Sequence, residues 1–468
     1  MIVERMINAM MAECKRNLSE YCSGLADLEL SPERSGQIVA GIQAAANAAS
    51  KAAFRVYVES KEELRDVVGV GGELYRFKYT SERSFLSPWG KVRIERRLYQ
   101  NAKDKTYIPL ESAWGMCGEF MMAEVREAVA YATAHLTSAE AAQLLRKTSQ
   151  FHPHRTQIEE TLKGIDARVS SCREELDGRI RAREEAPAGV RALVTSMDGA
   201  NVLLDEPGKK RGRPAERPKG RAGERPKTSY KNAMAGSFSF YGAVKEGEKS
   251  PQRLRTRYTV HMPEDLAPTF KRRFEAELDA AEALCEEGVA KVILCDGARS
   301  IWTYVEGNPR FAGYETLIDY WHAVEHLSLA SEALFGKGTT KAKAWYKEYA
   351  DKLLEQDNGA RKILKSMAYY TNNLKLPKSR RDDVKVQRTF FERNQSKMTY
   401  ADFRRRGLPI GSGPVEAACK TLIKNRMCRS GMRWSREGGQ RILDLRCYVK
   451  SNRWDAFWDE YMKLGSAA

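Results

Sequence analysis

The sequence predicts an α/β protein with a sheet-containing core in its second half, a long helical stretch, and a mainly helical N-terminal region that carries a small β segment. Between residues 190 and 296, short apolar runs of strand length alternate with turn residues. Residues 1–60 and the stretch after residue 314 instead place apolar residues at helical spacing. The 468 residues are also enough for roughly two to four domains.

The N-terminal region, residues 1–111, begins with helical patterns and then changes to short alternating runs. The runs LYRFKY and KVRIERRLY lie between Gly71 and Gln100 and are separated by Ser-Pro-Trp-Gly. This alternation indicates a small β segment behind the first helices.

Residues 112–188 are predicted to be helical and to contain a candidate helix-turn-helix. Thr137 and Glu140 have the spacing of a capping box, which marks the start of one helix, and a second helix follows after a short break. A helix-turn-helix would present Arg155 and Gln157 to DNA. An ordinary helical hairpin is the alternative interpretation.

Residues 189–325 are predicted to form the first part of the core. A buried strand over 190–204 is followed by two more strands, a helix and a strand that ends at Cys295. Between the first two strands lies a basic loop, residues 207–232, with ten basic residues, four prolines and four glycines. Such a composition cannot pack into a core. Residues 326–406 then form the helical stretch, and residues 407–468 complete the core with a basic tail.

The basic loop contains KKRGRP, which resembles an AT-hook. An Arg-Gly-Arg-Pro sequence suits the narrow minor groove of A·T-rich DNA, because glycine lets the backbone lie deep between two arginines. The expected DNA contacts of this segment are Lys209, Lys210, Arg211 and Arg213. A solvated basic linker that contacts phosphates without reading sequence is the alternative.

The charge of the chain indicates a polyanionic partner. The 79 Lys and Arg residues outnumber the 62 Asp and Glu residues, which gives a net charge of +17 and a pI near 9.3. Nucleic acid is the commonest partner of so basic a protein. No apolar run has the length of a membrane span, and the nine cysteines form no CxxC pair. We therefore expect a cytoplasmic, nucleoid-associated protein without a membrane partner.

Two aspartates follow apolar runs of strand length. Asp198 follows VTSM and Asp296 follows VILC, so each carboxylate is expected at the end of a buried strand. Acids that meet at one sheet edge repel each other unless a cation lies between them. They are therefore candidate ligands of Mg²⁺, which prefers oxygen ligands.

Glu416 is the third candidate acid. Ser412-Gly413-Pro414 is a typical helix start, and Glu416, Lys420 and Lys424 then repeat at every fourth position of the helix. The lysines would hold phosphates beside the carboxylate. Read alone, however, Glu416 and Lys420 are also spaced as an ordinary helix-surface ion pair.

The region from Lys420 to Arg453 has the composition of a DNA-backbone interface. It holds ten basic residues against two acids, and it includes an aromatic residue for stacking. A tryptophan of the core beside a solvated face is the alternative. The predicted DNA-binding residues of this region are Lys420, Lys424, Arg426, Arg429, Arg433 and Trp434.

Three segments resemble the ISKra family of bacterial insertion-sequence transposases. The block LPIGSGPVEAACKTLIKNRMCRSGMRWSREGGQRILDLR, residues 408–446, resembles the C-terminal hallmark of that family. IDYWHAVEHL, residues 318–327, and CDGA, residues 295–298, point to the same family. The resemblance covers the last 280 or so residues well and the N-terminal 190 only in general layout.

The resemblance implies a ribonuclease-H-like core with a mixed sheet and a DDE triad of Asp198, Asp296 and Glu416 that binds two Mg²⁺, with Mn²⁺ as a substitute. It implies that the helical stretch is an insertion domain, as in Mutator- and hAT-type transposases. Asp319 and His322 would match the [C/D]xxH motif that braces the core or contacts DNA near the cut. It also implies a homodimer or higher oligomer that brings together double-stranded transposon ends and target DNA.

Metal-dependent phosphoryl transfer at DNA ends is therefore the expected function. The sequence contains no GxSxG elbow, no Walker loop, no HExxH and no CxxC-based metal site. Two other classes share most of these features. One is a ribonuclease-H-like nuclease that cuts without strand transfer, and the other is a domesticated DNA-binding protein, which normally has a broken triad.

Overall fold

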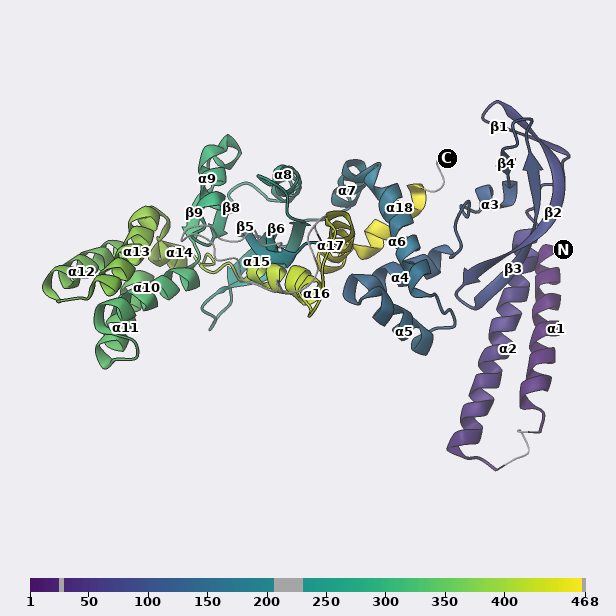
Figure 1. Ribbon diagram of the computed structural model, residues 1–468, viewed down its shortest axis with the longest axis horizontal. Coiled ribbons are helices and arrows are strands. Elements are labelled where there is room, and N and C mark those ends of the chain that lie inside the picture. The colour runs from purple at the N-terminus through teal and green to yellow at the C-terminus, as the bar shows by residue number, and fades with distance from the viewer. Residues whose placement is uncertain (25–28, 206–229, 465–468) are drawn as a thin grey trace, which may run out of the picture. The chain divides into compact units, whose positions relative to one another are not determined.

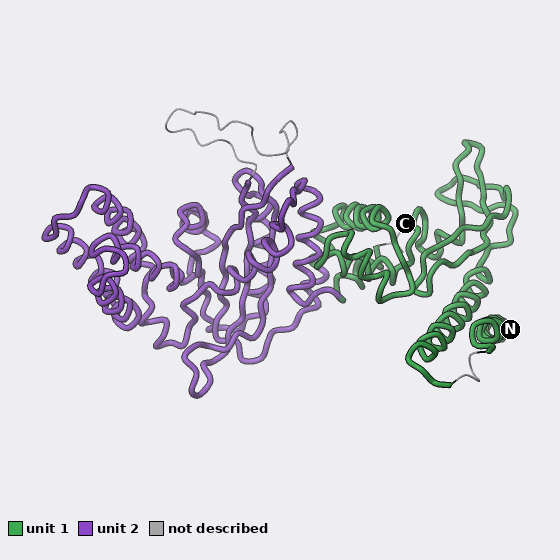
Figure 2. The backbone as a smooth tube through the Cα atoms, turned by 60° about the horizontal axis from the view of Figure 1, so that its bottom comes forward, with its two compact units in different colours: residues 1–178, 455–468 green, residues 179–454 purple. Residues whose placement is uncertain are grey.

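The computed structural model describes residues 1–24, 29–205 and 230–464, which divide into two compact units (Figure 2). Unit 1 comprises residues 1–178 and the segment from Asp455 onward, and unit 2 comprises residues 179–454. The predicted regions 1–111 and 112–188 thus fall largely in one unit. The segment from Asp455 groups with the N-terminal residues rather than with the rest of the predicted region 407–468.

Unit 1 joins a helical hairpin, a small antiparallel sheet and a group of short helices. Its sheet has the strand order β1-β2-β3-β4, with every neighbouring pair antiparallel. The strands are β1 (Val67–Val70), β2 (Glu73–Ser87), β3 (Gly90–Gln100) and β4 (Thr106–Tyr107). The helices are α1 (Ile2–Cys22), α2 (Pro32–Glu59), α3 (Pro109–Ala113), α4 (Ala123–His135), α5 (Ser138–Thr148) and α6 (Arg155–Ser170). Two further helices, α7 (Arg173–Ala182) and α18 (Trp454–Leu464), contain the points where the chain passes between the units.

Unit 2 is built on a mixed five-stranded sheet of order β7-β6-β5-β8-β9 (Figure 1). Its strands are β5 (Ala192–Leu203), β6 (Tyr230–Val244), β7 (Pro251–His261), β8 (Ala290–Cys295) and β9 (Glu315–Ile318). The pairs β5–β6 and β6–β7 are antiparallel, and each joins strands that are consecutive in the sequence. The pairs β5–β8 and β8–β9 are parallel; α8 leads from β7 into β8, and α9 lies between β8 and β9. The predicted α/β class with a mixed sheet is therefore confirmed.

The helices α8 to α14 share one hydrophobic core with this sheet, and α15 to α17 pack on the sheet in a second cluster. The core contains Phe238 from the sheet, Phe274 from α8, Leu327 from α10 and Phe391 from α13, all fully buried. The helices are α8 (Pro268–Glu282), α9 (Arg299–Gly307), α10 (Tyr320–Phe335), α11 (Thr340–Glu355), α12 (Gly359–Asn373), α13 (Lys378–Asn394), α14 (Tyr400–Arg405), α15 (Gly413–Ala418), α16 (Asn425–Met427) and α17 (Arg436–Lys450). Short 3₁₀ turns are η1 (Pro309–Phe311) and η2 (Gln395–Lys397), and η3 (Cys419–Lys424) is π-helical. The predicted boundary at residues 325 and 326 falls inside α10.

Two details differ from the predictions. The strand predicted over 190–204 is present as β5, but Asp198 does not lie at its end, because β6 pairs with β5 along its whole length to Leu203. In addition, β9 was not predicted from the sequence; it has only four residues before α10 begins. No described helix combines the length and apolar character of a membrane span.

Candidate active site on the central sheet

Asp198 lies where the parallel part of the sheet ends. The parallel ladder of β5 and β8 runs to the pair Thr195–Ile293, after which β5 continues with β6 as its only partner. The backbone N–H of Met197 donates a hydrogen bond to Sγ of Cys295 at 3.2 Å, which still holds the two strands together one residue before Asp198. The aspartate is thus presented beside the end of β8.

Asp296 follows directly after β8, as the sequence predicted. Continuing the register of Thr195 and Ile293 along both strands brings Asp198 level with Asp296 on neighbouring strands. The Asp296 carboxylate accepts a hydrogen bond from the backbone N–H of Ala298 at 3.0 Å, which orients it at the start of α9. Two acids far apart in the sequence are therefore side by side at one sheet edge.

Glu416 is placed by the apolar side of its own helix. Val415, Cys419 and Leu422 are buried against the part of β5 and β6 that lies beyond Asp198, where Val202 and Ala235 belong to the same cluster. The extension of β5 is thus the platform on which α15 packs. The apolar side of the helix, with Val415, Cys419 and Leu422, faces the sheet. Glu416 lies on an adjacent side of the helix and is exposed.

The helix start predicted at Ser412 is confirmed, with Ser412 as N-cap and Pro414 in the first turn. The assumption of a regular helix after Glu416 is wrong, because residues 419–424 form a π-helical segment. A π turn holds more residues than an α turn and changes the angle between successive side chains. Lys420 and Lys424 are both exposed, but the simple four-residue repeat with Glu416 does not describe them.

Asp319 is buried and supports the site through hydrogen bonds to the backbone. It is 1% exposed and is the N-cap of α10, where its carboxylate accepts from the backbone N–H of His322 at 2.9 Å. Its other oxygen accepts from the backbone N–H of Ser412, and its own N–H donates to Cys295 at 2.8 Å. Through its backbone and its carboxylate, this one buried residue joins the end of β8 to the starts of α10 and of the helix that carries Glu416.

His322 lies half-buried between the carboxylates and the helices of unit 2. Its positive form would lower the pKa of Asp296, which shows that the ring lies within electrostatic reach of that acid. The neighbouring His326 is stacked on Phe390 with ring centres 3.6 Å apart and hydrogen-bonds to Gln387 at 2.6 Å. His326 is therefore a packed, partly buried histidine.

The acids influence one another electrostatically. Burial raises the pKa of Asp296, and the negative charges of Asp198 and Asp319 raise it further, against the hydrogen bond from Ala298. Partial removal from water raises the pKa of Glu416, and the charges of Asp319 and Asp198 add to this. The pKa values of Asp296 and Glu416 are thus both raised, as expected for carboxylates that lie near other negative charges.

Two residues that the sequence interpretation left without a role touch this cluster. The thiol of Cys419 is buried and hydrogen-bonded to Asp198, so α15 and β5 are joined next to the carboxylate. Trp321 is 65% exposed beside Asp319. Neither role could be read from the sequence, because a buried cysteine and a core tryptophan are the common cases.

The carboxylate oxygens of this cluster suit a hard divalent cation, although they are not grouped as a metal site. Among the described residues, no three His, Cys, Asp or Glu side chains are grouped closely enough to hold a metal ion as they stand. Asp198, Asp296 and Glu416 nevertheless supply only oxygen donors and excess negative charge, which is the ligand set that Mg²⁺ prefers. The residues fit such an ion in chemistry and would have to draw closer around it.

The predicted DNA-binding residues of the C-terminal region divide into exposed and buried ones. Lys420, Lys424 and Arg429 are exposed, and Arg433 is partly so. Arg426 is 3% exposed and its guanidinium lies over the ring of Trp434 at 5.1 Å. Arg426 is therefore not presented to a ligand, which corrects the prediction for this residue.

Trp434 is part of the scaffold. Its indole N–H donates to the carbonyl of Met427 at 3.0 Å, and its backbone pairs with Leu203 and Asp205 beyond the end of β5. Of the two interpretations that the sequence left open for Trp434, the structure favours the packed tryptophan. An indole held on this many sides is poorly placed to stack on a base.

The candidate helix-turn-helix in unit 1 has the predicted helices and the complete capping box of Thr137 and Glu140. Arg155 is exposed but paired with Glu159 at 2.7 Å, and Gln157 caps its own helix by accepting from the N–H of His154. The connection between α5 and α6 is longer than the three or four residues of a typical helix-turn-helix. DNA reading by this pair remains a prediction. Lys209, Lys210, Arg211 and Arg213 lie outside the described residues.

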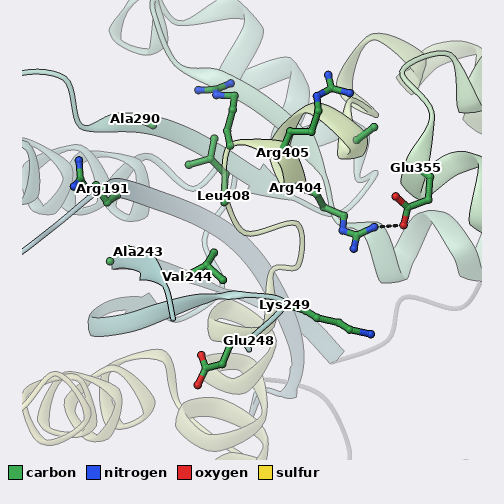
Figure 3. A pocket seen from close by; sticks show the side chains of 14 residues that line it. Arg191, Ala243, Val244, Glu248, Lys249, Ala290, Glu355, Arg404, Arg405 and Leu408 are labelled. Atoms are coloured by element: carbon green, nitrogen blue, oxygen red, sulfur yellow. Dashed lines mark hydrogen bonds and ion pairs between the residues drawn. The ribbon is translucent and has the colours of Figure 1, made fainter. Parts of the chain in front are cut away.

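A separate cavity of about 1060 Å³ opens at the other end of the sheet, where β5 and β8 begin (Figure 3). Arg191, Lys249 and Arg404 contribute positive charge to its lining. Arg404 is paired with Glu355, and Arg405 with Asp357 at 2.9 Å, so carboxylates offset much of that charge. The cavity is thus distinct from the carboxylate cluster, and its five basic residues outnumber its two acidic ones, Glu248 and Glu355.

No protein-family profile and no curated protein matches this chain.

Proposed function

We propose that this protein is a DNA transposase whose catalytic centre is the carboxylate cluster of Asp198, Asp296 and Glu416. The observation that carries the proposal is that Asp198 lies within electrostatic reach of both Asp296 and Glu416, which come from the end of a neighbouring strand and from a helix packed on the sheet. More than 200 residues separate Asp198 from Glu416 in the sequence. The charge of +17 and the exposed Lys420 and Lys424 support a nucleic-acid substrate.

We propose further that unit 2 has a ribonuclease-H-like fold with a helical insertion. The order β7-β6-β5-β8-β9, antiparallel in its first half and parallel in its second, supports this assignment. The positions of Asp198 on β5, of Asp296 directly after β8 and of Glu416 on α15 also support this assignment. The helices α10 to α13 intervene between Asp296 and Glu416, where an insertion is expected.

In this proposal, Asp198, Asp296 and Glu416 would hold divalent magnesium. When bound, the ion would lower the pKa of a water or a 3′-hydroxyl and stabilise the leaving oxygen. The chain's own residues supply positioning: Asp319 fixes the helix of Glu416, Cys419 orients Asp198, and Lys420 and Lys424 attract the phosphodiester. No covalent nucleophile from the protein is required, because phosphoryl transfer depends mainly on positioning and charge neutralisation.

Cleavage and joining of DNA ends test the proposal. A labelled duplex that carries the DNA flanking this chain's coding region is incubated with Mg²⁺ and either the wild type or Asp296→Asn. We expect the wild type to nick and join the ends and the variant to bind the duplex but to lose at least about a hundredfold in rate. Asp382→Asn, an exposed change on α13, is the matched control and should behave as the wild type.

Thermal unfolding gives a second readout that does not depend on finding the correct DNA ends. Mg²⁺ or Mn²⁺ should raise the melting temperature of the wild type and of Asp382→Asn, but much less that of Asp296→Asn, because the repulsion relieved by the cation is weaker. Equal stabilisation of all three proteins, together with equal cleavage, contradicts a catalytic role for the cluster. Nicking without joining favours a nuclease instead, and DNA binding with neither activity favours a binding protein.

A further inference from the structure

Trp321 stands apart from the other seven tryptophans. Its side chain is 65% exposed, whereas every other tryptophan is buried or partly buried, and all eight belong to the described residues. An exposed indole of this size is unusual on a folded protein unless it serves an interaction.

The indole is nevertheless held in place on one side. A Cβ atom added to Gly411 would lie 3.2 Å from both Cδ1 and Nε1 of Trp321, so the ring rests directly on the glycine backbone. The indole also meets the buried Tyr320 in an edge arrangement, with ring centres 5.3 Å apart. The backbone N–H of Tyr320 in turn donates to Ile410 at 3.0 Å. The ring is thus fixed by its neighbours and still open to solvent.

This position is at the margin of the carboxylate cluster. Asp319 and His322, two residues before and one residue after Trp321, are the braces of that cluster. Gly411 lies one residue before Ser412, the N-cap of the helix that carries Glu416. If the carboxylate cluster acts on DNA, as proposed, an aromatic ring at this margin would lie near the nucleotides next to the reacting phosphate.

The surroundings suit a flat aromatic ligand better than the apolar face of a protein. Glu325, one helical turn after Trp321, is charged and its side chain is 78% exposed. It interrupts the surface between Trp321 and the exposed Leu329. A single indole without an apolar patch around it offers stacking area but little hydrophobic docking area.

We propose that Trp321 is a base-stacking residue, which holds one unpaired nucleobase of the DNA strand next to the carboxylate cluster. This inference rests on the proposed function. A base within a duplex has both faces covered by its neighbours, so it can stack on Trp321 only after it has left the helix. Stacking accepts any base, because every base has an aromatic face.

Binding measurements with paired and gapped DNA test this inference without requiring cleavage. Wild type, Trp321→Ala and Trp321→Phe are titrated, all in the Asp296→Asn background, with a fully paired duplex and with the same duplex interrupted by a short single-stranded gap. Trp321→Ala should weaken binding of the gapped DNA about tenfold or more and binding of the paired DNA less than about twofold. Trp321→Phe, which keeps a smaller ring, should lie between them.

Two controls separate stacking from other causes. Tyr369→Ala removes another exposed aromatic ring, 62% exposed on α12, and should leave the binding of both DNAs unchanged. A fluorescent adenine analogue in the gap should be quenched by the wild-type chain and by Trp321→Phe but not by Trp321→Ala.

The outcomes distinguish this inference from the proposed function. Equal binding of gapped DNA by Trp321→Ala and the wild type, or equal losses on gapped and paired DNA, overturns base stacking and leaves the proposed function intact. A change of oligomeric state in Trp321→Ala overturns it in favour of a contact with a second copy of this chain. Absence of DNA binding by the wild type overturns both proposals.

Discussion

At the scale of single residues, the Asp-Gly pairs at 198–199 and 296–297 have a steric explanation. The amide of Asn232 occupies the space where a side chain on Gly199 would begin, and the ring of Phe390 occupies the same space at Gly297. Both glycines therefore follow a candidate catalytic aspartate because another element approaches the backbone there. The sequence shows that each aspartate is followed by glycine, but not the reason, because the residues that approach these glycines lie far along the chain.

Gly297→Ala should consequently disturb the site through Phe390. The new methyl group would overlap the ring of Phe390, which is itself stacked on His326, so the ring must move. We expect a loss of about 1–3 kcal/mol in the free energy of unfolding, measured by denaturant titration. Combining it with Phe390→Leu should recover part of that loss. If Gly297→Ala is as stable as the wild type, the close approach of Phe390 has no energetic consequence.

At the scale of elements, a buried ionic network joins four segments of unit 2. Arg453, after α17, is paired with Glu184, before β5, at 2.8 Å, and with Glu277, on α8, at 3.0 Å. Arg257 on β7 completes the network through Glu184, and Arg181 through Glu277. Since all these charges lie inside the protein, removing one leaves its partner uncompensated.

Glu277→Gln should therefore destabilise the protein in a pH-dependent way. Burial alone would raise the pKa of Glu277, but Arg453 and Arg181 hold it below its ordinary value of 4.5. A lowered pKa means that the ionised form stabilises the fold above about pH 4.5 and that this contribution is lost as the pH falls below that value. We expect the variant to be less stable by about 3 kcal/mol or more at pH 7.

Unfolding of both proteins at neutral and acidic pH measures this effect. The difference between the wild type and Glu277→Gln should shrink as the pH falls below 4.5. A difference that is constant with pH would show that the loss comes from packing rather than from the charge. Glu306→Gln is a suitable control, because Glu306 is 57% exposed in its pair with Lys397 and should contribute little.

At the scale of the whole molecule, the helical stretch of unit 2 is not an independent domain. Phe274 under the sheet and Phe391 on α13 belong to the same hydrophobic cluster, whereas unit 1 has separate clusters. The helices α10 to α14 should therefore unfold together with the sheet, in one cooperative transition.

Calorimetry of three variants tests this prediction. Phe274→Ala and Phe391→Ala should each lower the same transition, with a loss of about 3–5 kcal/mol because both rings are fully buried. Val129→Ala in unit 1 is the control and should lower a different transition. Separate transitions for Phe274→Ala and Phe391→Ala would show that the helices fold by themselves.

The sequence alone determined the local features of this protein. Apolar runs predicted β5 and β8, the capping box at Thr137 predicted the start of α5, and Ser412-Gly413-Pro414 predicted the start of α15. These features depend on neighbouring residues, whose contacts are set by the periods of helix and strand. The same patterns marked Asp198 and Asp296 as candidate metal ligands, whereas Glu416 was joined to them as a triad by the family resemblance.

Only the tertiary structure decided which of the selected residues meet and which are covered. It brought Asp198 within electrostatic reach of both Asp296 and Glu416, buried Arg426 against Trp434 and left Trp321 exposed. It also extended β5 beyond Asp198, because its partner β6 comes from residues beyond the basic loop. Exposure and strand length depend on contacts between distant segments, and such contacts leave no periodic signal in the sequence.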